Sequence, residues 1–266
     1  MNPVCTICAL FCGDYPDLLE RCLKPLLGLD PAKFRLRLGF NAISDRSQTK
    51  LYELMQSHLK HATLVEHVVN ISSNIYKYPM LRNLLNGTQP AASDPAGKSI
   101  AFTSPIGTEW MMWLDDDSGI SAADPSARID EIIKEAVAGE ADMVGSIWTM
   151  TLTNDQMEWV KKQPWHNNRP ISPRVAFCTG GLWLIKTSIL LEHSWPPSDC
   201  IHRGGDVMLG QMMYQQKYKI KTLRDKSGLL INASMTGKEC SSPHRVANFY
   251  PVGHRNANQP RPLDQP

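Results

Sequence analysis

Apolar residues recur in short blocks through the first part of the chain, and the blocks alternate between strand spacing and helix spacing. Residues 4–10 form a mostly apolar run rich in strand formers, which Gly13 ends. Residues 17–27 place leucines at helical spacing behind an acidic first residue, and Pro25 is expected to kink or end that helix. The chain therefore opens with a strand followed by a helix.

The same unit recurs twice more. Strand patterns cover residues 34–41 and 62–69, and Ser44 or Ser47 can cap the helix between them. A short helical stretch, 78–85, follows the later strand. Three consecutive strand–helix units are typical of a parallel sheet with helices on its faces. The pattern thus predicts an α/β protein.

Further elements are expected after a loop rich in Pro, Gly and Ser that ends near residue 108. The expected strands are 110–114, 141–148, 175–185 and 219–223, and the expected helices are 124–138 and 206–216. Residues 150–173 are polar and rich in proline, and we assign no regular element to them. Because no linker separates two parts of the chain, we expect a single domain over residues 1–266.

Composition narrows the class of protein. Hydrophobic residues make up 42% and charged residues 20%, which is ordinary globular usage and excludes collagen, coiled-coil and disordered classes. No apolar run approaches the roughly 18 residues that cross a bilayer, and the first residues do not read as a signal peptide. The seven cysteines lack disulfide-like spacing, so we expect free thiols, a cytoplasmic location and no membrane partner.

The whole chain has nearly equal numbers of basic and acidic residues, with 28 Lys and Arg against 26 Asp and Glu. The two kinds are not evenly distributed along the sequence. Residues 217–266 carry nine basic and three acidic residues. A basic C-terminal fifth suits an acidic partner such as a phosphate group or a nucleic acid, and it is equally compatible with a solvated surface and a loose tail.

The strongest chemical signal is a run of three aspartates, Asp115, Asp116 and Asp117, directly after the apolar run 110–114. Ligands of open α/β sheets bind outside the carboxyl ends of the strands, and carboxylates there suit Mg²⁺ or Mn²⁺, which prefer oxygen ligands. In an extended segment Asp115 and Asp117 would point to the same side, one toward a metal ion and the other toward a ribose hydroxyl. The alternative is an acidic loop that caps a turn.

Two other places could belong to a site. Gly180 and Gly181 interrupt an apolar strand, which indicates a bulge or close approach of the backbone to a ligand, or simply a tight bend. Asp206 follows two glycines at the start of a helix, where it could be a helix cap or a general base.

Isolated basic side chains are weaker candidates. Arg82, in the helical stretch 78–85, could face phosphates or simply be an exposed helix residue. His244 or His254 could offer a neutral imidazole to a metal ion, although most histidines in such tails have no such role.

The order of these features resembles that of the GT-A glycosyltransferases, in particular inverting enzymes similar to family two. A strand–helix start, an aspartate cluster of the DXD kind, a strand with two glycines and Asp206 before a helix follow one another over roughly residues 3–225. The chain departs from the family at Asn41 and Gly205, where acidic residues are usual. The resemblance implies a GT-A-type, Rossmann-like, mostly parallel sheet flanked by helices. It also implies a nucleotide-sugar-binding half (1–120), an acceptor-facing half (121–240) and a basic tail (241–266).

Carried over position by position, the resemblance implies a metal-dependent inverting hexosyltransferase that uses a nucleoside-diphosphate sugar, taken here as UDP-linked. Asp206 would deprotonate the acceptor hydroxyl, and Asp117 and His244 would bind Mn²⁺ or Mg²⁺. The nucleotide sugar would be bound by Thr6, Ala9, Asn41, Arg82, Asp115, Asp116, Gly180 and Gly181.

The acceptor is inferred from charge and aromatic residues. The residues that would suit a nucleic-acid strand with an extruded base are Trp159, Trp165, Arg245, Phe249, Tyr250 and Arg255. This profile resembles the TET-associated, base-J-type DNA glycosyltransferases of bacteriophages and implies a hydroxymethylated pyrimidine such as hydroxymethylcytosine as acceptor, in the host cytoplasm. The alternatives are a protein or saccharide acceptor, a metal-dependent nucleotidyltransferase or nuclease, and a non-enzymatic nucleic-acid-binding module.

Overall fold

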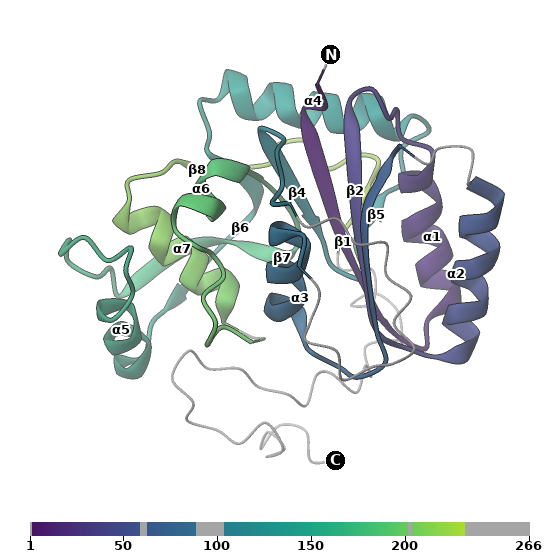
Figure 1. Ribbon diagram of the computed structural model, residues 1–266. Coiled ribbons are helices and arrows are strands. Elements are labelled where there is room, and N and C mark those ends of the chain that lie inside the picture. Colours follow the sequence, from purple (N-terminus) through teal and green to yellow (C-terminus); the bar gives the residue numbers. More distant parts are fainter. Residues whose placement is uncertain (1, 59–62, 89–103, 202–203, 232–266) are drawn as a thin grey trace, which may run out of the picture.

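A seven-stranded sheet runs through the computed structural model, which describes residues 2–58, 63–88, 104–201 and 204–231 (Figure 1). Its strand order is β3–β2–β1–β4–β7–β6–β8. The strands are β1 (Cys5–Gly13), β2 (Phe34–Ile43), β3 (Val65–Ile71), β4 (Trp110–Leu114), β6 (Met143–Thr151), β7 (Arg174–Lys186) and β8 (Ile220–Thr222). Strand β7 is antiparallel to β4 and β6, and the other neighbouring pairs are parallel. The predicted α/β fold with a mostly parallel sheet is confirmed.

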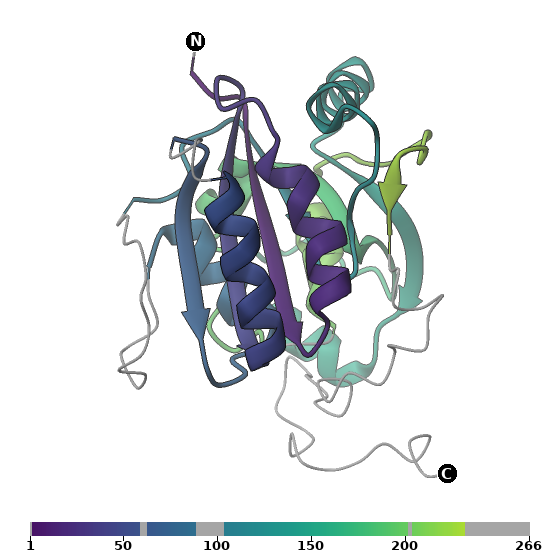
Figure 2. The same ribbon diagram turned by 90° about the vertical axis from the view of Figure 1, so that its right-hand side faces the viewer.

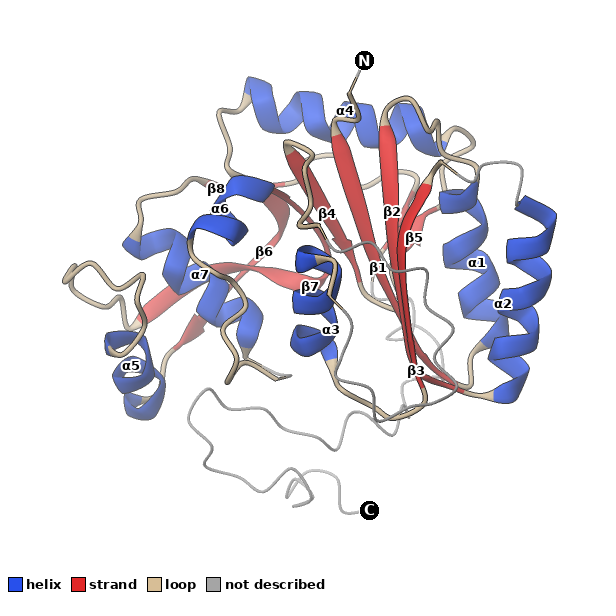
Figure 3. Ribbon diagram, viewed as in Figure 1, coloured by secondary structure: helices blue, strands red, loops and turns tan. Residues whose placement is uncertain are grey.

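Helices cover both faces of this sheet (Figure 3). One face carries α1 (Pro16–Leu27), α2 (Asp45–His58) and α4 (Pro125–Ala138), and Figure 2 shows α1 beside α2. The other face carries α3 (Lys77–Asn86), α5 (Asn154–Lys161), α6 (Thr187–Glu192) and α7 (Gly205–Gln215). A small sheet of β5 (Gly119–Ile120) and β9 (Leu229–Leu230) lies near α1. Among the described helices, none has the length and apolar character that a bilayer span requires.

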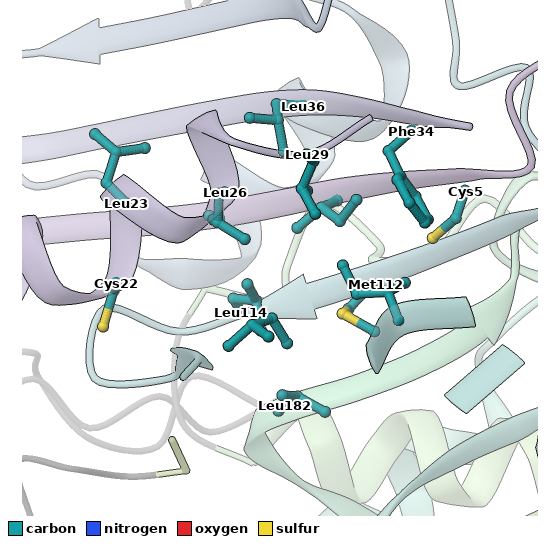
Figure 4. Packing of buried hydrophobic residues seen from close by; sticks show 14 of the residues in the cluster. Cys5, Cys22, Leu23, Leu26, Leu29, Phe34, Leu36, Met112, Leu114 and Leu182 are labelled. Atoms are coloured by element: carbon teal, nitrogen blue, oxygen red, sulfur yellow. The ribbon is translucent and has the colours of Figure 1, made fainter. Parts of the chain in front are cut away.

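Strand β4 shows how the apolar pattern builds two cores. Trp110, Met112 and Leu114 pack into the cluster shared with α1 and α4, whereas Met111 and Trp113 pack into the cluster on the opposite face. Figure 4 shows Met112 and Leu114 in the first cluster. Successive side chains of a strand point to opposite faces, so a central strand covered on both sides must be apolar throughout. Every residue of β4 is buried accordingly. The aspartates that follow β4 therefore begin where this double burial ends.

Capping residues account for the starts of α2 and α4. Ser44 caps α2, since its hydroxyl accepts a hydrogen bond from the Ser47 amide at 3.2 Å, and Asp124 caps α4 by accepting from the Ala127 amide at 2.9 Å. Helix α1 runs two residues beyond Pro25 and ends at Leu27, so the proline falls in its last turn rather than ending it.

Several short helices and strands were not expected from the sequence. Helix α5 lies within the polar stretch to which no element was assigned, and it starts with a capping box between Thr153 and Gln156. Helix α6 and the β5–β9 pair were also missed. All are short, so their apolar periodicity spans too few residues to be recognised.

A buried arginine ties β2 to its neighbours. The Arg37 side chain is 1% exposed, and its Nε donates to Glu66 on β3 at 2.9 Å. Its other nitrogens donate to the carbonyl oxygen of Leu84 at 2.7 Å and to that of Ser104 at 3.1 Å. The buried charge is thus paired and hydrogen-bonded, as a low-dielectric position requires.

Replacing Arg37 by methionine is expected to lower the free energy of unfolding by about 1–3 kcal/mol, because it leaves buried carbonyl oxygens without donors. Urea unfolding measures this. Arg46→Met is the control: Arg46 pairs with Asp14 but is 75% exposed, and its loss should cost within about 0.5 kcal/mol. Equal midpoints for the two variants would show that the Arg37 contacts add nothing.

Candidate active site

The three aspartates form a turn at the end of β4. The Ser118 amide donates to the Asp115 carbonyl oxygen at 2.9 Å, and the Asp115 amide donates to the Gly181 carbonyl oxygen at 2.9 Å. The expectation that Asp115 and Asp117 point to one side assumed an extended segment, whereas residues 116 and 117 form a turn. The turn instead gives each aspartate its own surroundings.

Asp115 is held by the protein through both carboxylate oxygens. Trp113 donates its indole N–H to Oδ1 at 2.7 Å, and the Lys77 ammonium donates to Oδ2 at 3.1 Å. Burial raises the pKa of Asp115, whereas the Lys77 ammonium acts in the opposite direction and favours the carboxylate. The side chain is still 22% exposed, so it can meet a ligand at the sheet edge.

Asp116 and Asp117 are half-buried beside it. The Cys12 thiol, at the end of β1, donates to Asp116 Oδ2 at 2.8 Å, and burial raises the pKa of Asp116 to about 6. Asp117 Oδ1 accepts a hydrogen bond from the Ser118 hydroxyl at 3.2 Å. Three carboxylates are therefore clustered where β1 and β4 end.

Asp206 joins this cluster from α7. The preceding Gly204 has a φ of 87°, a left-handed conformation suited to glycine, and the helix has no side-chain cap. The interpretation of Asp206 as a cap is therefore wrong. Its carboxylate oxygens lie 3.3 and 3.4 Å from the Lys77 ammonium. One lysine thus bridges Asp206 and Asp115.

The paired glycines mark a bulge in β7. Ile147 of β6 pairs with Cys178 and Gly145 with Trp183, so Ser146 alone faces the four residues 179–182. On the other side of β7, the Gly181 carbonyl oxygen accepts from the Asp115 amide, which continues the pairing of Leu114 with Leu182. Backbone of β7 therefore forms a wall of the aspartate turn, and Gly180 lies in the same segment.

Asn41 lies at the same edge but acts on the chain before α3. Its side-chain amide donates to Asn74 Oδ1 at 2.7 Å, and its own Oδ1 accepts from the Ile75 amide at 2.9 Å. These bonds fix the loop between β3 and α3. Asn41 is 2% exposed, so its contacts are with this loop rather than with open solvent.

The side chains of three expected nucleotide-sugar residues do not face the site. Thr6 is fully buried near the amino end of β1 and accepts from the Thr108 hydroxyl at 2.9 Å. Ala9 pairs with Leu114, the residue before the aspartates, but its side chain is buried in the core shared with α1 and α4. The Arg82 guanidinium donates to the carbonyl oxygens of Pro196, Pro197 and Cys200, and so holds a loop rather than facing a phosphate. Ligands of such sheets lie beyond the carboxyl ends of the strands, and none of these side chains is there.

Other expected residues are either outside the described residues or buried. His244 and His254 lie outside the described residues, as do Arg245, Phe249, Tyr250 and Arg255. Trp159 and Trp165 are each 3% exposed and pack against one another in the core. They do not form a surface on which an extruded base could stack, because burial in the core leaves their rings no free face.

Lys77, Tyr78, Trp113 and Cys12 are site residues that the sequence reasoning missed. Lys77 is the first lysine or arginine in the sequence after the carboxyl end of β3. This position was a usable signal, because ligand sites gather beyond the carboxyl ends of strands. Trp113 and Cys12 were assigned to buried strands, and nothing in their spacing showed that their donor groups meet Asp115 and Asp116.

Gly205 leaves room for the Tyr78 ring. A Cβ added at Gly205 would lie 2.2 Å from Tyr78 Cζ, well inside any real contact. The acidic residue that GT-A enzymes usually carry here is therefore excluded by an aromatic ring. This packing explains the departure noted in the sequence.

Gly205→Ala is expected to lower the free energy of unfolding by about 1–3 kcal/mol and to reduce activity, because it displaces the Tyr78 ring, which packs on Gly205 and lies beside the Lys77 ammonium. Gly107→Ala is a matched control, since a Cβ there meets nothing within 4 Å. Thermal unfolding measures both. Equal stability of the two variants would contradict the close packing of Tyr78 on Gly205.

The oxygen donors at this edge fit a hard divalent cation such as Mg²⁺ or Mn²⁺. Within the described ranges, no group of three or more His, Cys, Asp or Glu side chains is arranged to hold a metal ion unaided. Mg²⁺ is usually bound by one or two carboxylates together with substrate phosphates and water, rather than by a complete protein cage. The residues present therefore fit an ion that binds together with a diphosphate.

Comparison with known proteins gives a likeness of fold. No protein-family model matches the chain, and no curated protein sequence matches it. The mannosyltransferase PcManGT from Pyrobaculum calidifontis, solved with GDP-Man and Mn²⁺, superposes with a TM-score of 0.51 at 16% identity over 85% of this chain and 56% of that one. Staphylococcus aureus TarS 1–349 superposes with a TM-score of 0.51 at 10% identity over 89% and 62%. The chain thus has a GT-A-like fold and spans less than two thirds of either structure.

Proposed function

We propose that this protein is a metal-dependent inverting glycosyltransferase that moves a sugar from a UDP-linked donor to a hydroxyl acceptor. The observation that carries the proposal is the meeting of Asp206 with the aspartate turn at the carboxyl edge of a GT-A-like sheet. The likeness to a mannosyltransferase solved with GDP-Man and Mn²⁺ supports a nucleotide-sugar donor and a divalent cation, and the UDP link of the donor is part of the proposal.

The chemistry assigns a role to each carboxylate. Asp206 takes the proton of the acceptor hydroxyl, which attacks the anomeric carbon from the face opposite the leaving diphosphate, so the configuration inverts. Asp115, Asp116 and the Gly181 backbone line the donor side. Asp117 would hold the cation, with His244 as a candidate second ligand. When bound, Mn²⁺ or Mg²⁺ supplies positive charge to the departing diphosphate.

The proposed acceptor is a hydroxymethylated pyrimidine in DNA. The nine basic residues against three acidic ones over residues 217–266 support it, since phosphate contacts dominate nucleic-acid binding. The buried Trp159 and Trp165 no longer contribute to this argument. A hydroxyl on a saccharide or protein is the alternative acceptor for the same carboxylates.

A screen of nucleotide sugars tests the proposal. The protein is incubated with each donor and Mn²⁺, with and without hydroxymethylated DNA, and released nucleoside diphosphate is measured. We expect release from one UDP-sugar that rises when the DNA is added. Release that is unaffected by DNA contradicts the DNA acceptor, and no release from any donor under all conditions contradicts glycosyl transfer itself.

A further inference from the structure

Lys77 occupies the centre of the proposed active site. Its ammonium lies 3.1 Å from Asp115 Oδ2 and 3.3 and 3.4 Å from the two oxygens of Asp206. The side chain is only 9% exposed. Asp115 follows β4, and Asp206 lies in the first turn of α7. The Lys77 ammonium therefore links the donor side of the proposed site to its acceptor side.

The chain that leads to Lys77 is held in an unusual conformation. Tyr76 has a φ of 66° and a ψ of 178°, a region that residues other than glycine rarely adopt. Its amide donates to Asn74 Oδ1 at 2.9 Å, and the same oxygen accepts from Asn41 at 2.7 Å. Such backbone persists only where its surroundings enforce it. Asn41 and Asn74 thus fix the start of α3.

Aromatic side chains lie against the ammonium, and one of them also donates to a carboxylate. Lys77 Nζ lies 5.6 Å from the centre of the Trp113 ring and 5.5 Å from that of Tyr78, within the range of cation–π attraction. The Trp113 indole N–H also donates to Asp115 at 2.7 Å. The two rings therefore hold the lysine, and Trp113 also holds its partner Asp115.

The charges around Lys77 explain why a cation is needed there. Carboxylates that share a half-buried site repel one another, and an ammonium between them removes most of that repulsion. Burial opposes the charged form of Lys77, but Asp115 and Asp206 together outweigh it and raise its pKa. Without the lysine, Asp206 would lose its strongest tie to the aspartate turn.

We infer that Lys77 is a positioning residue that keeps the carboxylate of Asp206 beside Asp115 and aimed at the acceptor hydroxyl. The kinetic consequence of this inference rests on the proposed function. The position of the Asp206 carboxylate beside Asp115 is a property of the fold and does not depend on that function. Direct binding of the donor diphosphate by Lys77 is the competing role.

Steady-state kinetics of full-length Lys77→Met and Lys77→Arg separate these roles. A misplaced catalytic group costs on the order of 10²-fold in rate, so we expect Lys77→Met to lower kcat by about 10²-fold with little change in the donor KM. Lys77→Arg should recover most of kcat, since a guanidinium can bind two carboxylates. A rise in donor KM with unchanged kcat would overturn the inference in favour of diphosphate binding.

Lys186→Met is the matched control. Lys186 also pairs with a carboxylate, Asp142 at 2.8 Å, and lies 6.0 Å from the centre of the Trp110 ring, but at the opposite end of β4. Its replacement should leave kcat unchanged. A loss of kcat equal to that of Lys77→Met would show a general effect on the fold and overturn the inference.

A crystal structure of Lys77→Met gives a readout that does not depend on activity. We expect the Asp206 side chain to turn away from Asp115 relative to the wild type. An unmoved Asp206 overturns the positioning role, whatever the kinetics. A wild-type protein that transfers no sugar counts against the proposed function instead, and the movement of Asp206 still decides the role of Lys77.

Discussion

Asp206→Asn is expected to lower the turnover of sugar transfer by about 10²–10⁴-fold while donor affinity stays near that of the wild type. Asparagine keeps the shape of the side chain but cannot take a proton from the acceptor hydroxyl. Asp206 reaches the site from α7, whereas the proposed donor groups follow β4 and lie on β7. The loss should therefore fall on kcat, measured by release of nucleoside diphosphate, with donor affinity measured by calorimetry.

Asp155→Asn provides the control for this variant. Asp155 also lies in the first turn of a helix, α5, but it is exposed and outside the site. Its replacement should not change turnover. The role of Asp206 as base is contradicted if Asp206→Asn turns over like the wild type, or if donor affinity falls as much as kcat.

Asp117→Ala is expected to abolish activation by Mn²⁺ and to leave about 1% or less of the turnover, since a bound cation contributes several kcal/mol to the stabilisation of a leaving diphosphate. In the proposed function, the resemblance to GT-A enzymes assigns the ion to Asp117. A titration of activity against Mn²⁺, after removal of metal with a chelator, measures the effect.

Asp14→Ala is the matched control for Asp117. Asp14 follows β1 at the same edge of the sheet, but its oxygens pair with Ser44 and Arg46. We expect this variant to be activated by Mn²⁺ at the same concentration as the wild type. If Asp117→Ala shows that same midpoint, Asp117 does not hold the ion.

The features that could be predicted from the sequence are those that depend on residues close together along the chain. The apolar block 110–114 predicted a buried strand, and Asp124 with Pro125 predicted the start of α4. The two glycines predicted a bulge, a close approach of the backbone to a ligand or a tight bend, and β7 has a bulge. Each of these depends on a local pattern, so the sequence alone was sufficient. The capping pair Thr153 and Gln156 was a local signal of the same kind that was overlooked.

The site itself depends on contacts between distant segments. Lys77 meets Asp206 because α3 and α7 lie on the same face of the sheet, and no spacing along the chain encodes that. Thr6 was placed in the site by the family resemblance, which does not tell how far a residue lies from the edge where the ligand binds. Gly205 could be understood only once the Tyr78 ring was seen against it.

A crystal structure of the protein with UDP and Mn²⁺ tests the central claim most directly. The account predicts that the diphosphate lies over the aspartate turn beside Gly181, with the ion on Asp117 and with Asp206 facing the space that the sugar would occupy. A nucleotide bound elsewhere, with neither ion nor phosphate at residues 115–117, would contradict it.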